Sequence, residues 1–108
     1  IIVVGDNDQD ILLAVNHLGE IGGGYVVVGN HQIIGAVPLS LAGLISLEPG
    51  AVVQQKVASL ISSAHGLGVA PGVDPFITLS FMALPVIPAL RLTDMGLFDV
   101  DAFKLIKD

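Results

Sequence analysis

The sequence contains three histidines, whose side chains could bind a metal ion or transfer protons. His17, His31 and His65 do not form an HxH or HExxH pair, the spacings that present two imidazoles to one metal ion. We place them on the first helix, in a hairpin turn and at the end of the second helix. Without a ligand spacing they are interpreted as solvated surface side chains, and the sequence predicts no metal ligand and no catalytic residue.

An acidic cluster, Asp6, Asp8 and Asp10, alternates like the first ligands of a calcium loop. The stretch lacks the glycine at the sixth place and the glutamate at the twelfth that such a loop requires, and it runs directly into a helical pattern. Asp6 or Asn7 can instead cap a helix, and carboxylates suit the positive end of a helix dipole. We therefore expect helix capping here.

The glycine run Gly22–Gly24 is not a dinucleotide-binding fingerprint. That motif follows a strand and opens a helix, whereas this run closes a helix and precedes a strand. At Gly5, the junction that would hold a phosphate is followed by carboxylates, which would repel it. No serine lies in a GxSxG context or in a Ser-Lys pair of known spacing. The motifs therefore predict no catalysis within the chain.

The elements that must position these residues follow from the hydrophobic pattern. Alternating or continuous apolar runs predict strands at residues 1–4, 25–28, 32–37 and 76–84 and near the end at 102–106, although the length of 76–84 also allows a helix. Apolar residues at helical spacing predict one helix that ends at the glycine run and a second that starts near Pro49, with Ser46 or Glu48 near its cap. Turns are expected at 29–30 and 94–96, and residues 38–46 read as an ordered loop.

This order predicts an α+β fold for one domain over residues 1–108. We expect a two-layer domain in which a mixed β-sheet carries two helices on one face, with β-α-β-β-α-β order plus a C-terminal strand. A ferredoxin-like split βαβ arrangement fits this order.

Composition narrows the classes of partner. The formal net charge is −6, which argues against nucleic acid and against acidic membranes. The uncharged run Phe76–Leu90 is shorter than the roughly 20 residues of a membrane span, and two prolines interrupt it. Cysteine is absent, which suits a reducing compartment. The chain opens with Ile1 inside an expected strand and shows no signal peptide, so we expect a fragment of a larger protein.

Only 13% of the residues are charged and 53% are hydrophobic, so we expect part of the apolar surface to face another body rather than water. Three stretches carry a resemblance: "PLSLAGLIS" followed by "LEP", "PFITLSFMALPVIPALRLTDMGLFD", and the opening "IIVVGDNDQDILLAVNHLGEIGGGYVVVGN". Together they resemble the C-terminal domain of bacterial adenine deaminases over essentially the whole chain. Two small departures are Ser40, where a proline is common, and Ile45, where a methionine is common.

The resemblance implies an enzyme of the amidohydrolase superfamily that hydrolyses adenine to hypoxanthine and ammonia in purine salvage and adenine catabolism. It also implies a cytoplasmic, homo-oligomeric protein whose catalytic (β/α)8 barrel lies N-terminal to this domain and binds manganese or iron. The metal-ligand motifs of that barrel do not occur here, so no metal or catalytic role is carried over to these residues. The isolated fragment is expected to bind no cofactor and to be inactive.

Two apolar segments are the candidates for contact with that barrel or with a neighbouring subunit. The first is a loop that faces the barrel or its active site, formed by Pro38, Leu39, Ser40, Leu41, Ala42, Gly43, Leu44 and Ser46. The second is an interface segment with Phe81, Met82, Leu84, Pro85 and Pro88. The alternatives are that both segments belong to the core of this domain, or that the chain is a stand-alone module for small-molecule binding or oligomerisation.

Overall fold

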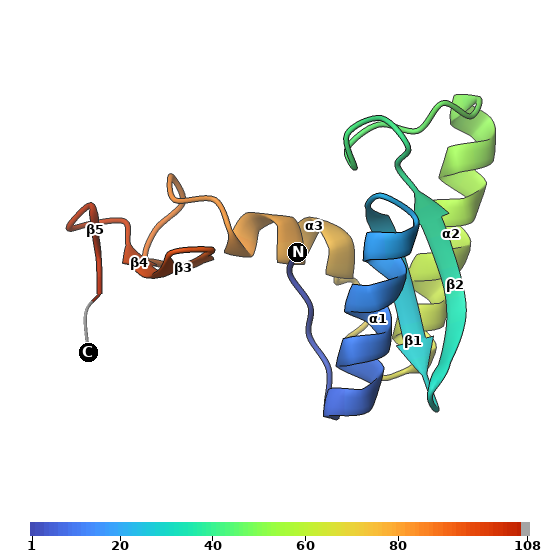
Figure 1. Cartoon of the computed structure of the whole chain (residues 1–108), viewed down its shortest axis with the longest axis horizontal. Coiled ribbons are helices and arrows are strands. Elements are labelled where there is room, and N and C mark those ends of the chain that lie inside the picture. The colour runs from blue at the N-terminus through green and yellow to red at the C-terminus, as the bar shows by residue number, and fades with distance from the viewer. Residues whose placement is uncertain (107–108) are drawn as a thin grey trace. The chain divides into compact units, whose positions relative to one another are not determined.

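A computed structural model describes residues 1–106 (Figure 1). The chain forms two compact units: unit 1 contains Val3–Pro75, and unit 2 begins at Phe76. The elements follow in the order α1 Asp8–Glu20, β1 Gly24–Gly29, β2 Gln32–Pro38, α2 Gly50–Gly66, α3 Pro75–Met82, β3 Leu90–Thr93, β4 Gly96–Asp99 and β5 Lys104–Leu105.

Helix α1 begins at the predicted cap. The Oδ1 atom of Asn7 accepts a hydrogen bond of 2.8 Å from the backbone N–H of Asp10. This bond satisfies one of the N–H groups that a first helical turn leaves without a partner. After the helix, the chain turns through Gly22, whose φ of +76° is accessible to glycine at little cost. The prediction of a capped helix that ends at the glycine run is confirmed.

Strands β1 and β2 form the predicted antiparallel hairpin. Asn30 and His31 make its turn with φ values of 51° and 60°. Two residues with positive φ give a turn whose twist matches that of the two strands. The register shifts between Val27 and Val28, which marks a β-bulge and increases the local twist.

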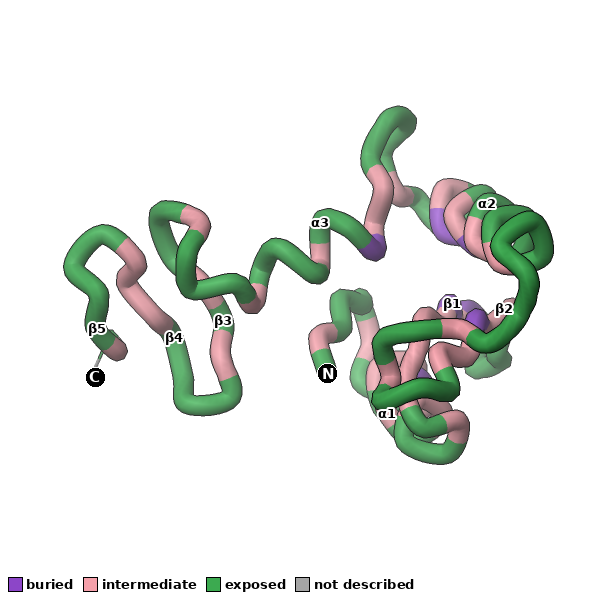
Figure 2. Tube along the Cα trace, turned by 90° about the horizontal axis from the view of Figure 1, so that it is seen from above, coloured by how far each residue is buried: buried purple, intermediate pink, exposed green. Residues whose placement is uncertain are grey.

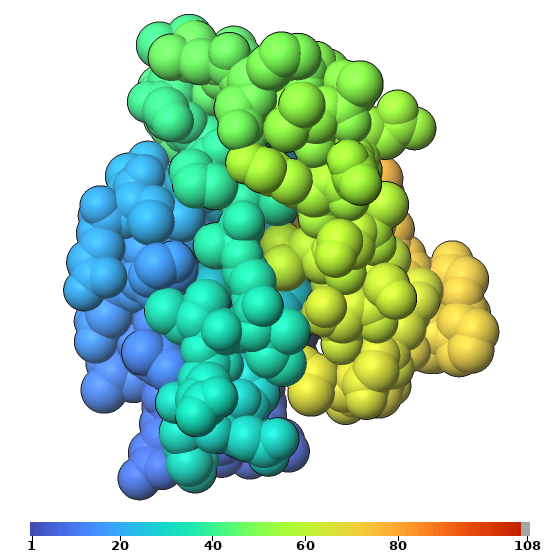
Figure 3. All heavy atoms as spheres, turned by 90° about the vertical axis from the view of Figure 1, so that its right-hand side faces the viewer, coloured from blue at the N-terminus to red at the C-terminus, as the bar shows by residue number. Residues whose placement is uncertain are grey.

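The core of unit 1 lies where the hairpin meets its two long helices. Figures 2 and 3 show α1 and α2 on either side of the hairpin, with β2 between them. Gly35 on β2 allows α2 to approach closely, because a Cβ atom at Gly35 would lie 3.0 Å from Cδ1 of Leu60. The buried apolar residues of this unit are Ala14, Val27, Val37, Leu60 and Ala64. No residue of β1 is exposed, as expected for a strand covered on both faces.

Helix α2 starts where the sequence predicted, but its cap differs from the prediction. Pro49 is the N-cap residue, and its carbonyl oxygen accepts hydrogen bonds from the N–H groups of Val52 and Val53. No side chain caps this end. The hydroxyl oxygen of Ser46 instead accepts a hydrogen bond of 3.2 Å from the N–H of Glu48, so this serine orders the preceding turn.

Unit 2 contains all of α3 except its first residue and a three-stranded antiparallel sheet in the order β3-β4-β5. The hydroxyl of Thr93 donates a 2.7 Å hydrogen bond to the carbonyl of Gly96 across the β3–β4 turn. The rings of Phe98 and Phe103 meet edge to face at 5.3 Å. The predicted turn at residues 94–96 and the short C-terminal edge strand are confirmed.

The strand predicted at residues 1–4 is absent. Residues 1–4 form no strand, and the side chains of Ile1 and Val4 are 80% and 74% exposed. Their β-branched side chains favour an extended backbone, but a strand also needs a neighbour to pair with. The described residues provide no such neighbour for this segment.

The strand predicted at 76–84 is wrong, and the helical alternative for this stretch is correct. Pro75 occupies the first turn of α3, where its missing N–H breaks no helical bond. Pro85 follows three residues after the last helical residue, Met82, and cannot continue a helix. The stretch is apolar all round, so periodicity gave no means of separating a helix from a buried strand.

The predicted α+β class is confirmed, with helices packed on antiparallel β-structure. The predicted single mixed sheet is wrong, because the strands form two separate antiparallel sheets. Without a strand at residues 1–4 there is no parallel pair for α1 to connect. The two long helices consequently flank the hairpin of unit 1 rather than lying together over one wide sheet (Figure 2).

Candidate functional site

The loop after β2 carries the most exposed apolar side chains of those predicted to make contact. Leu41 and Leu44 are 52% and 77% exposed, and the neighbouring Ile45 and Leu47 are also exposed. Ser40 and Ala42 are exposed as well, while the remaining predicted residues, Pro38, Leu39, Gly43 and Ser46, are half-buried. A monomeric protein seldom leaves contiguous apolar side chains in water, so this surface is a candidate contact site.

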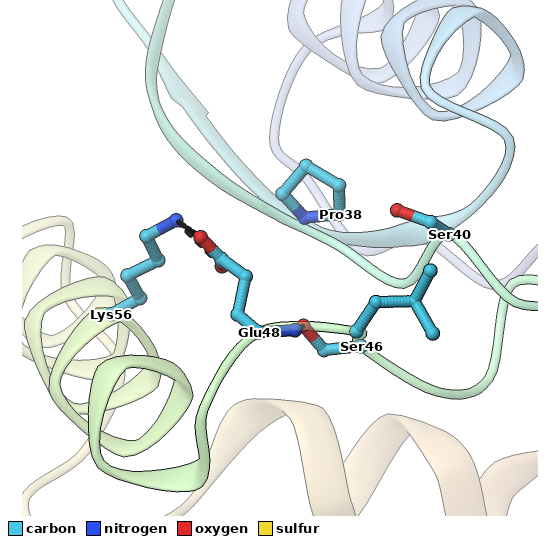
Figure 4. Close-up of a pocket in the computed structure, with 6 residues that line it drawn as sticks. Pro38, Ser40, Ser46, Glu48 and Lys56 are labelled. Atoms are coloured by element: carbon cyan, nitrogen blue, oxygen red, sulfur yellow. Dashed lines mark hydrogen bonds and ion pairs between the residues drawn. The ribbon is translucent and has the colours of Figure 1, made fainter.

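A hollow of about 270 Å³ opens at the base of this loop (Figure 4). Its lining comprises Pro38, Ser40, Ser46, Leu47, Glu48 and Lys56. The Lys56 Nζ lies 2.7 Å from each carboxylate oxygen of Glu48, and the two side chains point toward one another. Because these charges neutralise each other, the hollow offers hydroxyl and apolar contacts rather than a net charge. Sequence reasoning missed this pair, since a spacing of eight residues that spans a loop and a helix has no recognisable signature.

The second predicted segment lies in unit 2, at the end of α3 and in the turn that follows. Phe81, Met82 and Leu84 are 49%, 38% and 41% exposed, and Pro85 and Pro88 are exposed too. Phe76, at the start of the same helix, is buried. The structure thus leaves the predicted interface residues of this segment accessible within their own unit.

Asp10 and His31 form a contact that the sequence did not reveal. Oδ1 of Asp10 accepts a 2.9 Å hydrogen bond from the backbone N–H of His31 and lies 2.9 Å from its Nδ1. The hydrogen bond from the Asn7 amide lowers the pKa of Asp10 below its ordinary value; the two contacts with His31 act in the same direction, while desolvation opposes them. The pair ties the start of α1 to the hairpin turn. Its residues are 21 positions apart, and only the packing of helix on hairpin brings them together.

The other two histidines also have local partners. Nδ1 of His17 lies 3.5 Å from a carboxylate oxygen of Glu20 on the same helix. Nε2 of His65 lies 2.8 Å from the carbonyl oxygen of Val73. Within residues 1–106 no group of three or more His, Cys, Asp or Glu side chains could hold a metal ion. The residues present therefore do not fit the metal centre that the resemblance associates with the enzyme.

No helix in the described part of the chain is long and apolar enough to cross a membrane.

Comparison with known proteins decides the family. The model of the adenine deaminase C-terminal domain matches residues 1–104. The chain belongs to the adenine deaminase C-terminal domain family. The resemblance carried by the opening segment, the loop and the stretch 75–99 is thereby confirmed.

Curated relatives agree with this membership of the adenine deaminase C-terminal domain family. Adenine deaminase 1 of Rhizobium meliloti is 51% identical over 106 residues, the adenine deaminase of Bacillus subtilis 47%, and adenine deaminase 2 of Carboxydothermus hydrogenoformans 45%. Each alignment covers 98% of this chain but only 18 or 19% of the relative. The chain thus spans about a fifth of the length of these relatives.

Proposed function

We propose that this chain acts as the C-terminal domain of an adenine deaminase, a hydrolase that converts adenine to hypoxanthine and ammonia. The match to the family over residues 1–104 and the names of the relatives support this proposal. In this reaction a water oxygen attacks the ring carbon that bears the amino group. The exocyclic amino nitrogen gains a proton that derives from this water, the exocyclic C–N bond breaks, and the amino group leaves as ammonia.

The chemical step is assigned to the part of the polypeptide outside this chain. The three histidines lie apart on α1, in the hairpin turn and at the end of α2, each beside a local partner. Together with the carboxylates of residues 1–106 they form no group of three or more that could hold a metal ion. A catalytic (β/α)8 barrel of the amidohydrolase type with manganese or iron fits the family resemblance.

The role proposed for this chain is to cover and support the catalytic part. The observation that carries it is the exposed apolar surface of the loop 38–46, where Leu44 is 77% exposed. Burying such side chains against another body yields about 25 cal/mol for each Å² of apolar area removed from water. The segment with Phe81, Met82 and Leu84 is a second candidate contact, either with the same body or with a neighbouring subunit of a homo-oligomer. We further propose that this adenine deaminase acts in the cytoplasm and in purine salvage.

The test compares the full polypeptide that contains this chain with the chain alone. Both are purified and incubated with adenine, and hypoxanthine and ammonia are quantified. We expect one ammonia for each hypoxanthine with the full polypeptide and no conversion by residues 1–108. A full polypeptide that leaves adenine unchanged but deaminates another substrate, or deamination by the chain alone, would contradict the proposal.

A further inference from the structure

Four apolar side chains close together in the sequence are exposed in the loop that follows β2 in unit 1. We call this group the leucine knob. It consists of Leu41, Leu44, Ile45 and Leu47. No ionisable side chain occurs between Gln32 and Leu47, so covering the knob would not require the burial of a charge.

The backbone of the knob is already folded into a tight turn. The N–H of Leu41 donates to the carbonyl of Ile45 at 3.0 Å, and the N–H groups of Leu44 and Ile45 donate back to the carbonyl of Leu41. Ala42 and Gly43 at the tip have φ values of 57° and 71°, the combination of a two-residue hairpin turn. The apolar side chains are therefore presented by an ordered backbone.

One side of the knob is held by the glycine run after α1. The N–H of Leu39 donates a 3.0 Å hydrogen bond to the carbonyl of Gly23. Gly23 also lies so close to the tip of the knob that a Cβ atom added to it would be 2.7 Å from Cα of Gly43. Any side chain at Gly23 would push the knob away, since its neighbour is backbone and cannot rotate aside.

The other side of the knob is held by α2. Glu48 directly follows the knob, and its N–H donates a hydrogen bond of 3.2 Å to the hydroxyl oxygen of Ser46 within it. Glu48 then pairs with Lys56 on α2 at 2.7 Å (Figure 4). The knob is thus tied to the glycine run after α1 on one side and to α2 on the other.

We propose that the leucine knob is a preformed contact that inserts into an apolar recess of the remaining part of the same polypeptide, with Gly23 as the residue that positions it. This proposal rests on the proposed function. A segment ordered in advance loses little conformational entropy when it binds, which favours docking of a small surface. The occupant is assigned to the same polypeptide because about four-fifths of each relative lies outside the matched region. A covalently linked partner is present at high effective concentration.

The first experiment measures whether the knob is covered in the full polypeptide. Leu44→Cys is compared with Leu12→Cys, which lies on α1 outside the knob and is 60% exposed. Alkylation by iodoacetamide is followed at each peptide by mass spectrometry, relative to the same protein in urea. We expect the cysteine at 44 to react at least about tenfold more slowly than the cysteine at 12. Equal rates would overturn the docking of the knob.

The second experiment tests the positioning role of Gly23. Gly23→Ala is combined with Leu44→Cys and compared with Gly22→Ala in the same background. Both glycines have positive φ, 108° and 76°, but a Cβ atom at Gly22 meets no atom within 4 Å. We expect Gly23→Ala to raise the alkylation rate at position 44 about tenfold and Gly22→Ala to leave it nearly unchanged. Equal effects of the two alanines would overturn the role of Gly23.

Two further outcomes separate the alternatives. Protection at position 44 that disappears on dilution would assign the covering body to a second copy and overturn the same-polypeptide contact. Protection that is independent of concentration supports it. Adenine turnover is measured on the same samples. Absent turnover with a protected cysteine at 44 would contradict the proposed function while leaving the covered knob established.

Discussion

Gly23 and Gly43 pack backbone against backbone, with room for no side chain at Gly23. The contact joins two stretches that are 20 residues apart, the exit of α1 and the tip of the loop after β2. Both stretches belong to the segments that carry the family resemblance. The same contact therefore explains both glycines. The backbone after α1 packs directly against the tip of the apolar loop.

This contact predicts a difference between two neighbouring glycines in the stability of the chain. Gly22→Ala introduces a side chain at positive φ and should lower the free energy of unfolding by about 1–2 kcal/mol. Gly23→Ala adds a collision with backbone, so its total cost should reach about 2–4 kcal/mol. Urea denaturation of the two variants checks this. Equal midpoints would mean that the loop moves aside without cost.

A second prediction contrasts two leucines of the same unit. Leu60 on α2 is 4% exposed and Leu44 is 77% exposed. Leu60→Ala leaves a cavity beside the hairpin and should cost about 2–5 kcal/mol, whereas Leu44→Ala should change the stability of the chain by no more than about 0.5 kcal/mol. Thermal and urea unfolding of the 108-residue chain provide the measurement. A large loss with Leu44→Ala would show that the knob belongs to the core of this domain.

A third prediction concerns acid stability. The pKa of Asp10 is lowered from 3.8, first by the Asn7 hydrogen bond and further by His31. A lowered pKa means that the folded state favours the carboxylate. Its stabilisation is therefore present above the unfolded pKa and is lost as the pH falls through the lower, folded value. Asp10→Asn keeps the side-chain shape and one acceptor oxygen but removes this charge.

The melting temperatures of the wild type and Asp10→Asn should consequently differ most well above pH 3.8 and converge as the pH falls below the lowered pKa of Asp10. Asp8→Asn is the matched control, because Asp8 lies in the same helical turn and is exposed. We expect a weaker dependence on pH for that variant. A constant gap between wild type and Asp10→Asn over the whole range would contradict the contribution of the carboxylate.

The elements with local signals could be predicted from the sequence. Asn7 and the glycine run mark both ends of α1. The apolar strands around the turn signal at Gly29 and Asn30 mark the hairpin, whose turn residues in the structure are Asn30 and His31. Each signal acts through a few neighbouring residues, so no knowledge of tertiary packing was needed. The strand predictions for residues 1–4 and 76–84 failed because their apolar runs show no periodicity and because a strand depends on a distant partner.

The candidate site was only partly accessible to sequence reasoning. The loop 38–46 was singled out by its composition and its resemblance, and its leucines are exposed. The Gly23–Gly43 contact and the Asp10–His31 pair depend on how α1 lies against the hairpin, which no residue spacing encodes. The proline and glycine of this stretch predicted an ordered loop, but only the fold shows that the glycine run after α1 holds it.

The last prediction tests the loop as a contact surface in the full polypeptide. Leu44→Asp should lower kcat/KM for adenine by about tenfold or more, or disrupt assembly, because a carboxylate cannot be buried in an apolar contact without a partner. A charge at Leu41 should act in the same direction.

Leu12→Asp is the control, since Leu12 is also exposed but lies on α1 outside the loop. Steady-state kinetics and size-exclusion chromatography measure the two effects. Because Leu41 and Leu44 are exposed within this chain, a loss in their variants without a loss in Leu12→Asp would point to a body beyond unit 1 rather than to misfolding of the domain. Wild-type turnover and wild-type oligomeric state in the Leu41 and Leu44 variants would exclude the loop as a docking surface.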